Sequence, residues 1–171
     1  EGIPVMRKRF PDYSTYARST MEALFTTQQR KGSFRLLANH MSSSLIRNDG
    51  QGKFSMHALP VEAQFSMLNG MVLEDFNGDG NLDLLLNGND FGTEVPFGRY
   101  DALNGLVLLG SGDGNFKPLS IAESGIYIPG NGKGVSMLRN AAGALMVAAT
   151  ENRGPLRIFE ASTKLKCYVA E

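Results

Sequence analysis

The sequence predicts a mostly β fold built from repeated antiparallel units and preceded by a short helical segment. Beyond Gly32, short apolar runs alternate with glycine and asparagine, which is typical of strands joined by tight turns. The chain has 171 residues, with 20 glycines, 7 prolines and no tryptophan. This length corresponds to one domain, and this composition is that of a turn-rich globular protein.

An internal repeat supports the β assignment. Residues 48–54 (NDGQGKF) and 110–116 (GSGDGNF) share the pattern Gly-x-Gly-x-Phe and lie 62 positions apart. The same offset places Asn69-Gly70 on Asn131-Gly132. Each unit is predicted to contain a strand, the glycine hairpin, a second strand, and then two further strands after the Asn-Gly pair.

Four antiparallel strands in each unit, repeated at a period of tens of residues, predict the blades of a β-propeller. The offset of 62 also superposes residues 84–86 on 146–148, and a third copy begins at residues 153–159. The prediction is about two and a half blades, which make an incomplete ring.

Two segments follow from the composition: a linker and helical segment at residues 1–32, and the blades at residues 33–171. Pro4 and Pro11 indicate an extended entry, and apolar residues at helical spacing after Ser14 predict an amphipathic helix packed on an apolar surface. A second helical turn is expected at residues 27–31. The chain begins at Glu1 without a methionine or a signal peptide, so we expect a segment of a longer protein.

Charge and hydropathy exclude several functions. Lysine plus arginine and aspartate plus glutamate both total 17, so no basic excess is available to attract nucleic acid. No apolar run is long enough to span a membrane. The single cysteine, Cys167, excludes an internal disulfide and is expected to be a small buried residue of the last strand.

Residues 75–83 read DFNGDGNLD and predict a calcium-binding loop. Calcium prefers six to eight oxygen ligands, which a tight loop supplies at alternate positions. The predicted ligands are the side chains of Asp75, Asn77, Asp79 and Asp83 and the backbone carbonyl of Asn81.

The loop differs from an EF-hand, which has a glutamate at position twelve and helices on both sides. Position twelve is Leu86, and the flanking runs at residues 71–73 and 84–86 are strand-like. Asp83 at position nine is therefore the expected bidentate ligand. The expected role is to hold one blade together, without contacting a substrate.

The nine-residue loop and the Gly-x-Gly-x-Phe hairpins resemble the FG-GAP or VCBS repeats of integrin alpha-subunit propellers. The likeness spans residues 34–160 and is greatest to large exported VCBS-repeat proteins of Bacteroidetes-type bacteria. The resemblance implies export, a location at the cell surface or bacterial outer membrane, and a place near the C-terminus of a longer chain. Met137, Arg139 and Ala141 replace the acidic positions in the second unit, so one Ca²⁺ per chain is expected.

The insertion at residues 89–104 is the candidate recognition segment, because loops between strands gather at a propeller mouth. Its candidate binding residues are Glu94, Arg99, Tyr100 and Asp101. The alternative is a long hairpin that lies over a neighbouring blade.

Three functions remain open. The first is a non-catalytic, calcium-stabilised binding or assembly module that holds a protein or carbohydrate partner outside the cytoplasm. The second is the propeller portion of an exported polysaccharide-acting enzyme, with acids drawn from Asp90, Glu94 or Asp101. The third is a structural subunit of a surface complex, because an incomplete ring leaves sheet edges exposed to the rest of its own propeller or to other chains.

Overall fold

The structure is a computed structural model that describes residues 4–161 and 167–169. The chain forms two compact units that divide between His40 and Met41, and each is described by itself. Cys167 lies on β10 (Cys167–Val169), the last strand, as predicted. The predicted burial of its side chain lies outside the described residues.

The described residues of the first unit form four short helices: α1 (Pro4–Arg9), α2 (Tyr13–Ala17), α3 (Met21–Leu24) and α4 (Thr27–Arg30). The predicted extended entry is wrong at α1, since proline fits the first turn of a helix. Asp12 rather than Ser14 caps α2, and Thr20 caps a separate helix, α3. None of α2, α3 and α4 buries a residue, so the prediction of one amphipathic helix packed on an apolar surface is also wrong.

Residues 33–43 have no regular secondary structure. The first apolar run beyond Gly32, residues 34–38, is one of the runs for which the sequence predicts a strand, and its side chains are instead exposed, with Phe34 at 96% and Leu36 at 90%. The prediction fails because a strand needs hydrogen bonds from a neighbouring strand, and this segment pairs with no strand in the described structure.

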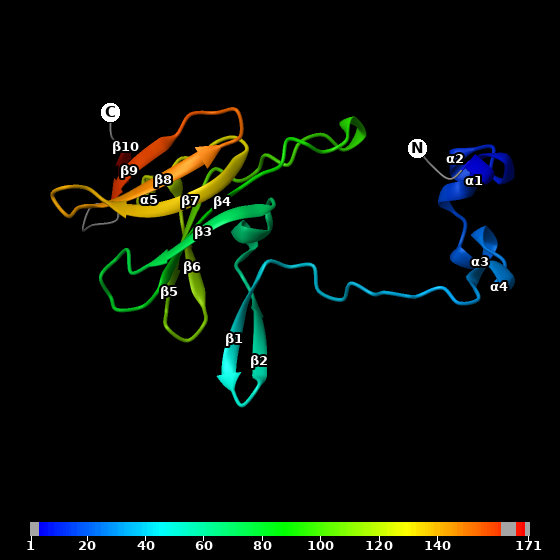
Figure 1. Cartoon of the computed structure of the whole chain (residues 1–171), viewed down its shortest axis with the longest axis horizontal. Helices are drawn as coiled ribbons and strands as arrows, with labels where there is room; N and C mark the ends of the chain where they lie inside the picture. Colours follow the sequence, from blue (N-terminus) through cyan, green and yellow to red (C-terminus); the bar gives the residue numbers. More distant parts are fainter. Residues whose placement is uncertain (1–3, 162–166, 170–171) are drawn as a thin grey trace. The chain divides into compact units, whose positions relative to one another are not determined.

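The second unit confirms the mostly β prediction, with ten strands in three antiparallel sheets among the described residues (Figure 1). A hairpin is formed by β1 (Ser44–Gly50) and β2 (Lys53–Ala58). The first four-stranded sheet, the β3–β6 sheet, contains β3 (Leu68–Glu74), β4 (Asp83–Gly88), β5 (Leu106–Gly110) and β6 (Phe116–Leu119). The second, the β7–β10 sheet, contains β7 (Gly132–Arg139), β8 (Leu145–Glu151), β9 (Arg157–Ala161) and β10.

Short helical turns connect these sheets. The 3-10 helix η1 (Val61–Gln64) joins β2 to β3, and α5 (Ile121–Ser124) joins β6 to β7. A second 3-10 helix, η2 (Val95–Phe97), lies in the long connection between β4 and β5.

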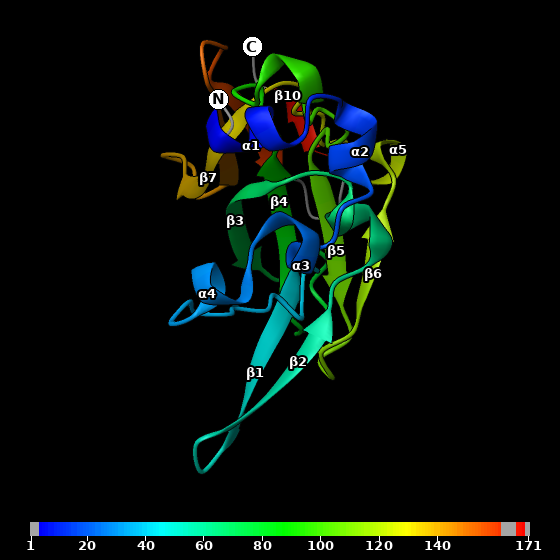
Figure 2. The same ribbon diagram turned by 90° about the vertical axis from the view of Figure 1, so that its right-hand side faces the viewer.

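Strand pairing corrects the predicted composition of a blade. The sequence unit corresponds to β1, β2, β3 and β4, but β2 and β3 do not pair. Each four-stranded sheet takes its first two strands from one sequence unit and its last two from the next. Hairpin β1–β2 therefore repeats β5–β6, the outer half of a sheet, and Figure 2 shows it extending away from the two larger sheets.

The strand register also corrects the repeat offset. The two glycine hairpins keep the offset of 62, since Phe54 lies opposite Asn48 and Phe116 lies opposite Gly110. The inner strands do not keep this offset: the same register shift lies between Leu68 and Gly70 in β3 and between Gly132 and Gly134 in β7. These shifts make β3 and β7 equivalent at an offset of 64.

For the second strands, Asn87 lies opposite Gly70 and Thr150 lies opposite Gly134, so β4 and β8 are equivalent at an offset of 63. Leu84 thus corresponds to Val147 and not to Met146. Because side chains alternate between the two faces of a strand, a shift of one residue exchanges the buried and exposed faces.

The two four-stranded sheets stack face to face over one apolar core. Leu85 and Val107 from the β3–β6 sheet pack with Val147 and Phe159 from the β7–β10 sheet. The opposite face of the β3–β6 sheet is covered by a second cluster that includes Ala63 of η1. As a result β4 is buried at every position.

The stacked sheets approach closely at Gly70. A Cβ atom at this position would lie 2.9 Å from the backbone nitrogen of Val135, so only glycine fits. Two side-chain amides join the sheets beside it: the buried Asn87 donates from Nδ2 to the carbonyl of Gly134 at 3.0 Å, and Asn69 donates from Nδ2 to the carbonyl of Gly132 at 2.8 Å.

The described residues form no closed barrel or propeller. One two-stranded and two four-stranded sheets are present, and their identity as propeller blades stays a prediction.

Candidate metal loop and recognition arm

The predicted metal loop connects β3 to β4. Glu74 and Asp83 lie opposite each other at the end of the ladder, and residues 75–82 form the connection between them. The expectation that strands, and not helices, flank the loop is confirmed.

Asp83 is fully buried, and its carboxylate connects the loop to the sheet. Its Oδ2 accepts the N–H of Phe76 at 2.9 Å, and its Oδ1 accepts the N–H of Gly110, at the end of β5, at 2.8 Å. A buried carboxylate is retained only where such donors replace water. Asp83 therefore fixes three segments of the β3–β6 sheet: the loop, β4 and β5.

Asp75 organises the exposed part of the loop. Its Oδ1 accepts the N–H groups of Gly78 at 2.7 Å and Asp79 at 3.1 Å, and its Oδ2 accepts that of Gly80 at 2.8 Å. Gly78 and Gly80 have φ angles of +78° and +87°, which glycine adopts without steric cost. The backbone thereby curls around the carboxylate of Asp75.

Asp79 is exposed, and Asn77 lies beside it. Asn77 Nδ2 donates to Asp79 Oδ2 at 2.9 Å, and the N–H of Asn81 donates to Asp79 Oδ1 at 2.8 Å. These two hydrogen bonds, the side-chain one first, hold the pKa of Asp79 below its ordinary value of 3.8. The carboxylate is therefore ionised at neutral pH.

The donor set of the loop fits a hard cation. Among the described ion pairs none involves Asp75, Asp79 or Asp83, so their negative charges have no positive side chain to balance them. A carboxylate has about four lone-pair positions. The carboxylates of Asp79 and Asp83 accept two hydrogen bonds each in the described structure, so each has lone pairs left for a cation.

The loop side chains turn toward backbone amides in this structure. Over the described residues, no three His, Cys, Asp or Glu side chains converge on a common point that would hold a metal ion. Calcium binding would therefore require the exposed Asp79 to reorient toward Asp75, while Asn77 and Asn81 would add amide and carbonyl oxygens.

The corresponding hairpin of the β7–β10 sheet has a different loop. β7 and β8 pair as far as Arg139 and Leu145, and Asn140 closes the short turn by accepting the N–H groups of Ala142 at 3.0 Å and Ala144 at 2.9 Å. This turn contains no carboxylate.

The insertion between β4 and β5 forms a narrow arm with η2 at its tip (Figure 1). Asp90 and Tyr100 pair through two backbone hydrogen bonds of 2.9 Å at its base. Val95 and Phe97 in η2 are 96% and 73% exposed. The tip of the arm therefore presents apolar side chains to solvent.

The four predicted binding residues are distributed along this arm. Glu94 immediately precedes η2, and the Arg99 guanidinium lies over the ring of Phe91, 5.0 Å from its centroid. Tyr100 and Asp101 are exposed at the base of the arm. No hydrogen bond in the described structure joins any two of the carboxylates of Asp90, Glu94 and Asp101, which were the acids considered for hydrolysis.

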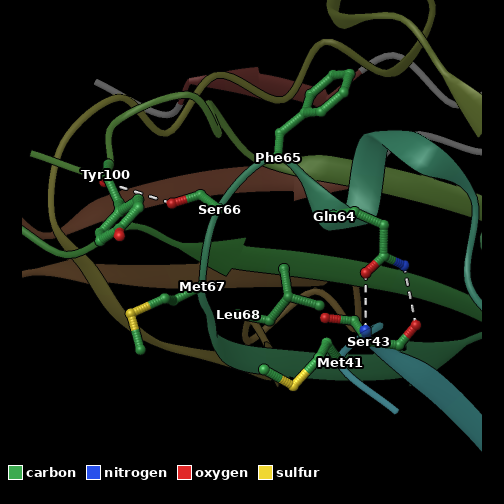
Figure 3. A pocket seen from close by; sticks show the side chains of 8 residues that line it. All are labelled: Met41, Ser43, Gln64, Phe65, Ser66, Met67, Leu68 and Tyr100. Carbon is green, nitrogen blue, oxygen red and sulfur yellow. Dashed lines mark hydrogen bonds between the residues drawn. The ribbon is translucent and has the colours of Figure 1, made fainter. Parts of the chain in front are cut away.

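A hollow of about 420 Å³ near the base of the arm was not predicted (Figure 3). Gln64 forms one wall, and its side chain holds the chain before β1: Oε1 accepts the N–H of Ser43 at 2.7 Å, and Nε2 donates to the Ser43 carbonyl at 2.9 Å. The hollow is lined by Met41, Ser43, Gln64, Phe65, Ser66, Met67, Leu68 and Tyr100. The sequence offered no signal for it, because its walls come from three separate segments.

No helix in the described part of the chain has the length and apolar character needed to cross a membrane. No family model matches the chain, and neither a curated protein nor a solved structure shows significant similarity to it.

Proposed function

We propose that this chain is part of a calcium-stabilised β-propeller of the FG-GAP or VCBS type, which acts as a non-catalytic binding or assembly module of an exported or cell-surface protein. Two four-stranded meanders stacked face to face, each with strands from two sequence units, support this architecture. The partner we propose is a protein or a carbohydrate.

The acidic loop is the observation that carries the proposal. Three carboxylates and two asparagines lie within nine residues, and no described cationic side chain pairs with the carboxylates. Asp75, Asn77, Asp79 and Asp83 would hold Ca²⁺ through side-chain oxygens and Asn81 through its carbonyl. The ion would supply the missing positive charge and cross-link the loop.

The role of the ion is structural. Asp83 already connects the loop to β5 through Gly110, so an ion bound to the same carboxylate stabilises the β3–β6 sheet on which the arm is mounted. The arm supplies the recognition surface, with exposed apolar side chains at η2 and Arg99 stacked on Phe91. Such a combination of apolar, aromatic and arginine side chains is typical of binding surfaces.

Isothermal titration calorimetry of calcium into chelator-treated protein tests the proposal. We expect one binding event per chain and a higher melting temperature, since a ligand at 100 times its Kd stabilises the folded state by about 2.7 kcal/mol. Asp79→Ala removes an exposed ligand and should abolish both effects. Asp113→Ala, which removes an exposed carboxylate in a different hairpin loop, is the matched control and should leave both unchanged.

Absence of heat and of a thermal shift in the unsubstituted protein would contradict calcium binding. Equal loss of binding in Asp79→Ala and Asp113→Ala would show that the loop is not the site.

A further inference from the structure

Hairpin β1–β2 is an outer half-sheet whose inner edge pairs with no other strand of the described structure. It repeats hairpin β5–β6 at the same register, and β5 pairs on its other side with β4. In the described structure β1 pairs only with β2. An unpaired strand edge presents backbone N–H and C=O groups that another strand can bind.

One face of β3 presents exposed apolar side chains. Met71 and Leu73 are 60% and 51% exposed. Their equivalents in β7, at the offset of 64, are Val135 and Met137, which the inner strands of the preceding sheet cover: Val135 is only 9% exposed and Met137 packs against the same core. We call the edge of β1 together with Met71 and Leu73 the β1/β3 surface.

The β1/β3 surface thus lacks what the β7–β10 sheet has, a preceding pair of inner strands. In the stacked sheets this pair is β3 and β4, which contact β7. An occupant with the sequence character of β3 and β4 is therefore expected.

Residues 22–39 resemble β3 and β4 in sequence. Residues 32–39 (GSFRLLAN) align with residues 80–87 (GNLDLLLN), the end of the acidic loop and most of β4. Glycine, two leucines and asparagine are identical, and the offset of 48 also places residues 23–25 (ALF) on residues 71–73 (MVL) of β3. This match is independent of the 62-residue repeat.

The order of segments along the chain is also that of a complete sheet. Residues 23–25 and 34–38 precede β1 and β2 in the same way that β7 and β8 precede β9 and β10. The connection between Asn39 and β1 is four residues, and that between β8 and β9 is five. Antiparallel strands are commonly joined by connections of this length.

Local contacts hold residues 22–39 in this structure, among them the Thr26 capping box of α4 and the ion pair of Glu22 with Arg30. Leu36 and Leu37 are 90% and 66% exposed, and each of α3 and α4 is four residues long and buries nothing. Isolated helices of this length are marginal in water, so converting them to strand costs little.

We propose that the β1/β3 surface is the docking site for residues 22–39 of this chain, which add to β1 as an antiparallel strand pair and complete a third four-stranded sheet. The ladder between β4 and β5 fixes the register. Leu84 and Leu85 lie opposite Leu108 and Val107, so Leu36 pairs with Ile46 and Leu37 pairs with Leu45. Leu37 then covers Met71 and Leu73 of β3, in the same way that Leu85 covers Val135 and Met137 of β7.

Disulfide trapping tests the register. In a background carrying Cys167→Ser, the pairs Leu36→Cys with Ile46→Cys and Leu37→Cys with Leu45→Cys place two cysteines directly opposite each other. Adjacent pairs on an antiparallel ladder alternate in Cα separation, so at least one of the two suits a disulfide. The matched control is Leu36→Cys with Leu45→Cys, whose side chains point to opposite faces.

We expect one designed pair to oxidise about tenfold faster than the control, because directly opposed side chains are neighbours and displaced ones are not. A cross-linked monomer on a non-reducing gel shows docking within one chain, and a cross-linked dimer shows exchange of the strand pair between two copies. Both results support the proposal.

Hydrogen exchange of the unsubstituted chain provides a second measurement that does not depend on substitution. Docking should slow exchange across residues 35–38 about 100-fold relative to an unstructured segment. Exchange at the unprotected rate, or oxidation no faster than in the control, would overturn the proposal.

Discussion

The β3–β6 and β7–β10 sheets share strand order, antiparallel pairing of consecutive strands and a register shift at the same place in the first ladder, yet they differ in burial. Every residue of β4 is buried, whereas β8 is buried only at Val147 and Ala149, the side chains that face the β3–β6 sheet. The sheets also differ in their first loop, which is acidic in one and a short asparagine turn in the other. The same backbone arrangement therefore serves as an interior layer in one case and as an outer layer in the other.

The largest expected difference concerns burial on the second strands. Leu85→Asp places a charge in the core between the sheets and should cost more than about 4 kcal/mol, enough to prevent folding. Its equivalent in β8, Ala148→Asp, lies on the partly exposed outer face and should cost about 1 kcal/mol. Urea denaturation of both variants measures the contrast. An equal loss in both would show that the outer face of the β7–β10 sheet is covered in solution.

The next difference concerns Asp83 and its equivalent, Met146. Asp83→Ala removes the acceptor of the part-buried N–H of Phe76 and of the buried N–H of Gly110, and two charge-assisted hydrogen bonds correspond to about 3 kcal/mol. Met146→Ala, at a half-buried position, should cost about 1 kcal/mol. Both unfolding curves are measured in excess chelator, so that the loss reflects the carboxylate and not a bound ion. A loss at Asp83 no greater than at Met146 would contradict the structural role of Asp83.

A smaller effect is expected for the asparagine turn. Asn140→Ala removes the acceptor of the Ala142 and Ala144 N–H groups, and because these groups are exposed to water the loss should be about 1 kcal/mol. Ala141→Ser in the same turn is the control and should stay within about 0.5 kcal/mol of the unsubstituted chain. Calcium should not alter either value, in contrast to variants of the acidic loop.

The smallest effect concerns the pH dependence of the hairpin between β5 and β6. Hydrogen bonds from the Ser111 hydroxyl and from the Asn115 backbone and side chain lower the pKa of Asp113 from 3.8 to about 2. A lowered folded-state pKa contributes stability that is present above the unfolded value and is lost as the pH falls from 3.8 toward about 2. Asp113→Asn should flatten the stability curve in this range. A carboxyl chemical-shift titration that places the pKa of Asp113 at or above 3.8 would contradict the assignment.

Local sequence patterns determined the parts of this protein that depend on neighbours along the chain. The glycine hairpins at residues 48–54 and 110–116, the strands around the acidic loop and the mostly β class all follow from turn residues and short apolar runs, whose physics is local. The ligand candidates Asp75 and Asp79 were identified in the same way, since residue type and spacing alone define an oxygen-rich loop.

Tertiary structure decided the features that depend on partners distant in sequence. The one-residue difference between the predicted and observed registers of β4 and β8 arises from connections of unequal length, because the first ladder of each sheet has the same register shift. It reverses which side chains of β8 are expected to face the core. The assignment of Asp83 as a bidentate metal ligand missed its hydrogen bond to Gly110, because that donor lies 27 positions along the chain. Residues 34–38 have the sequence of a strand but not its conformation here, since an apolar segment becomes a strand only when another strand edge accepts it.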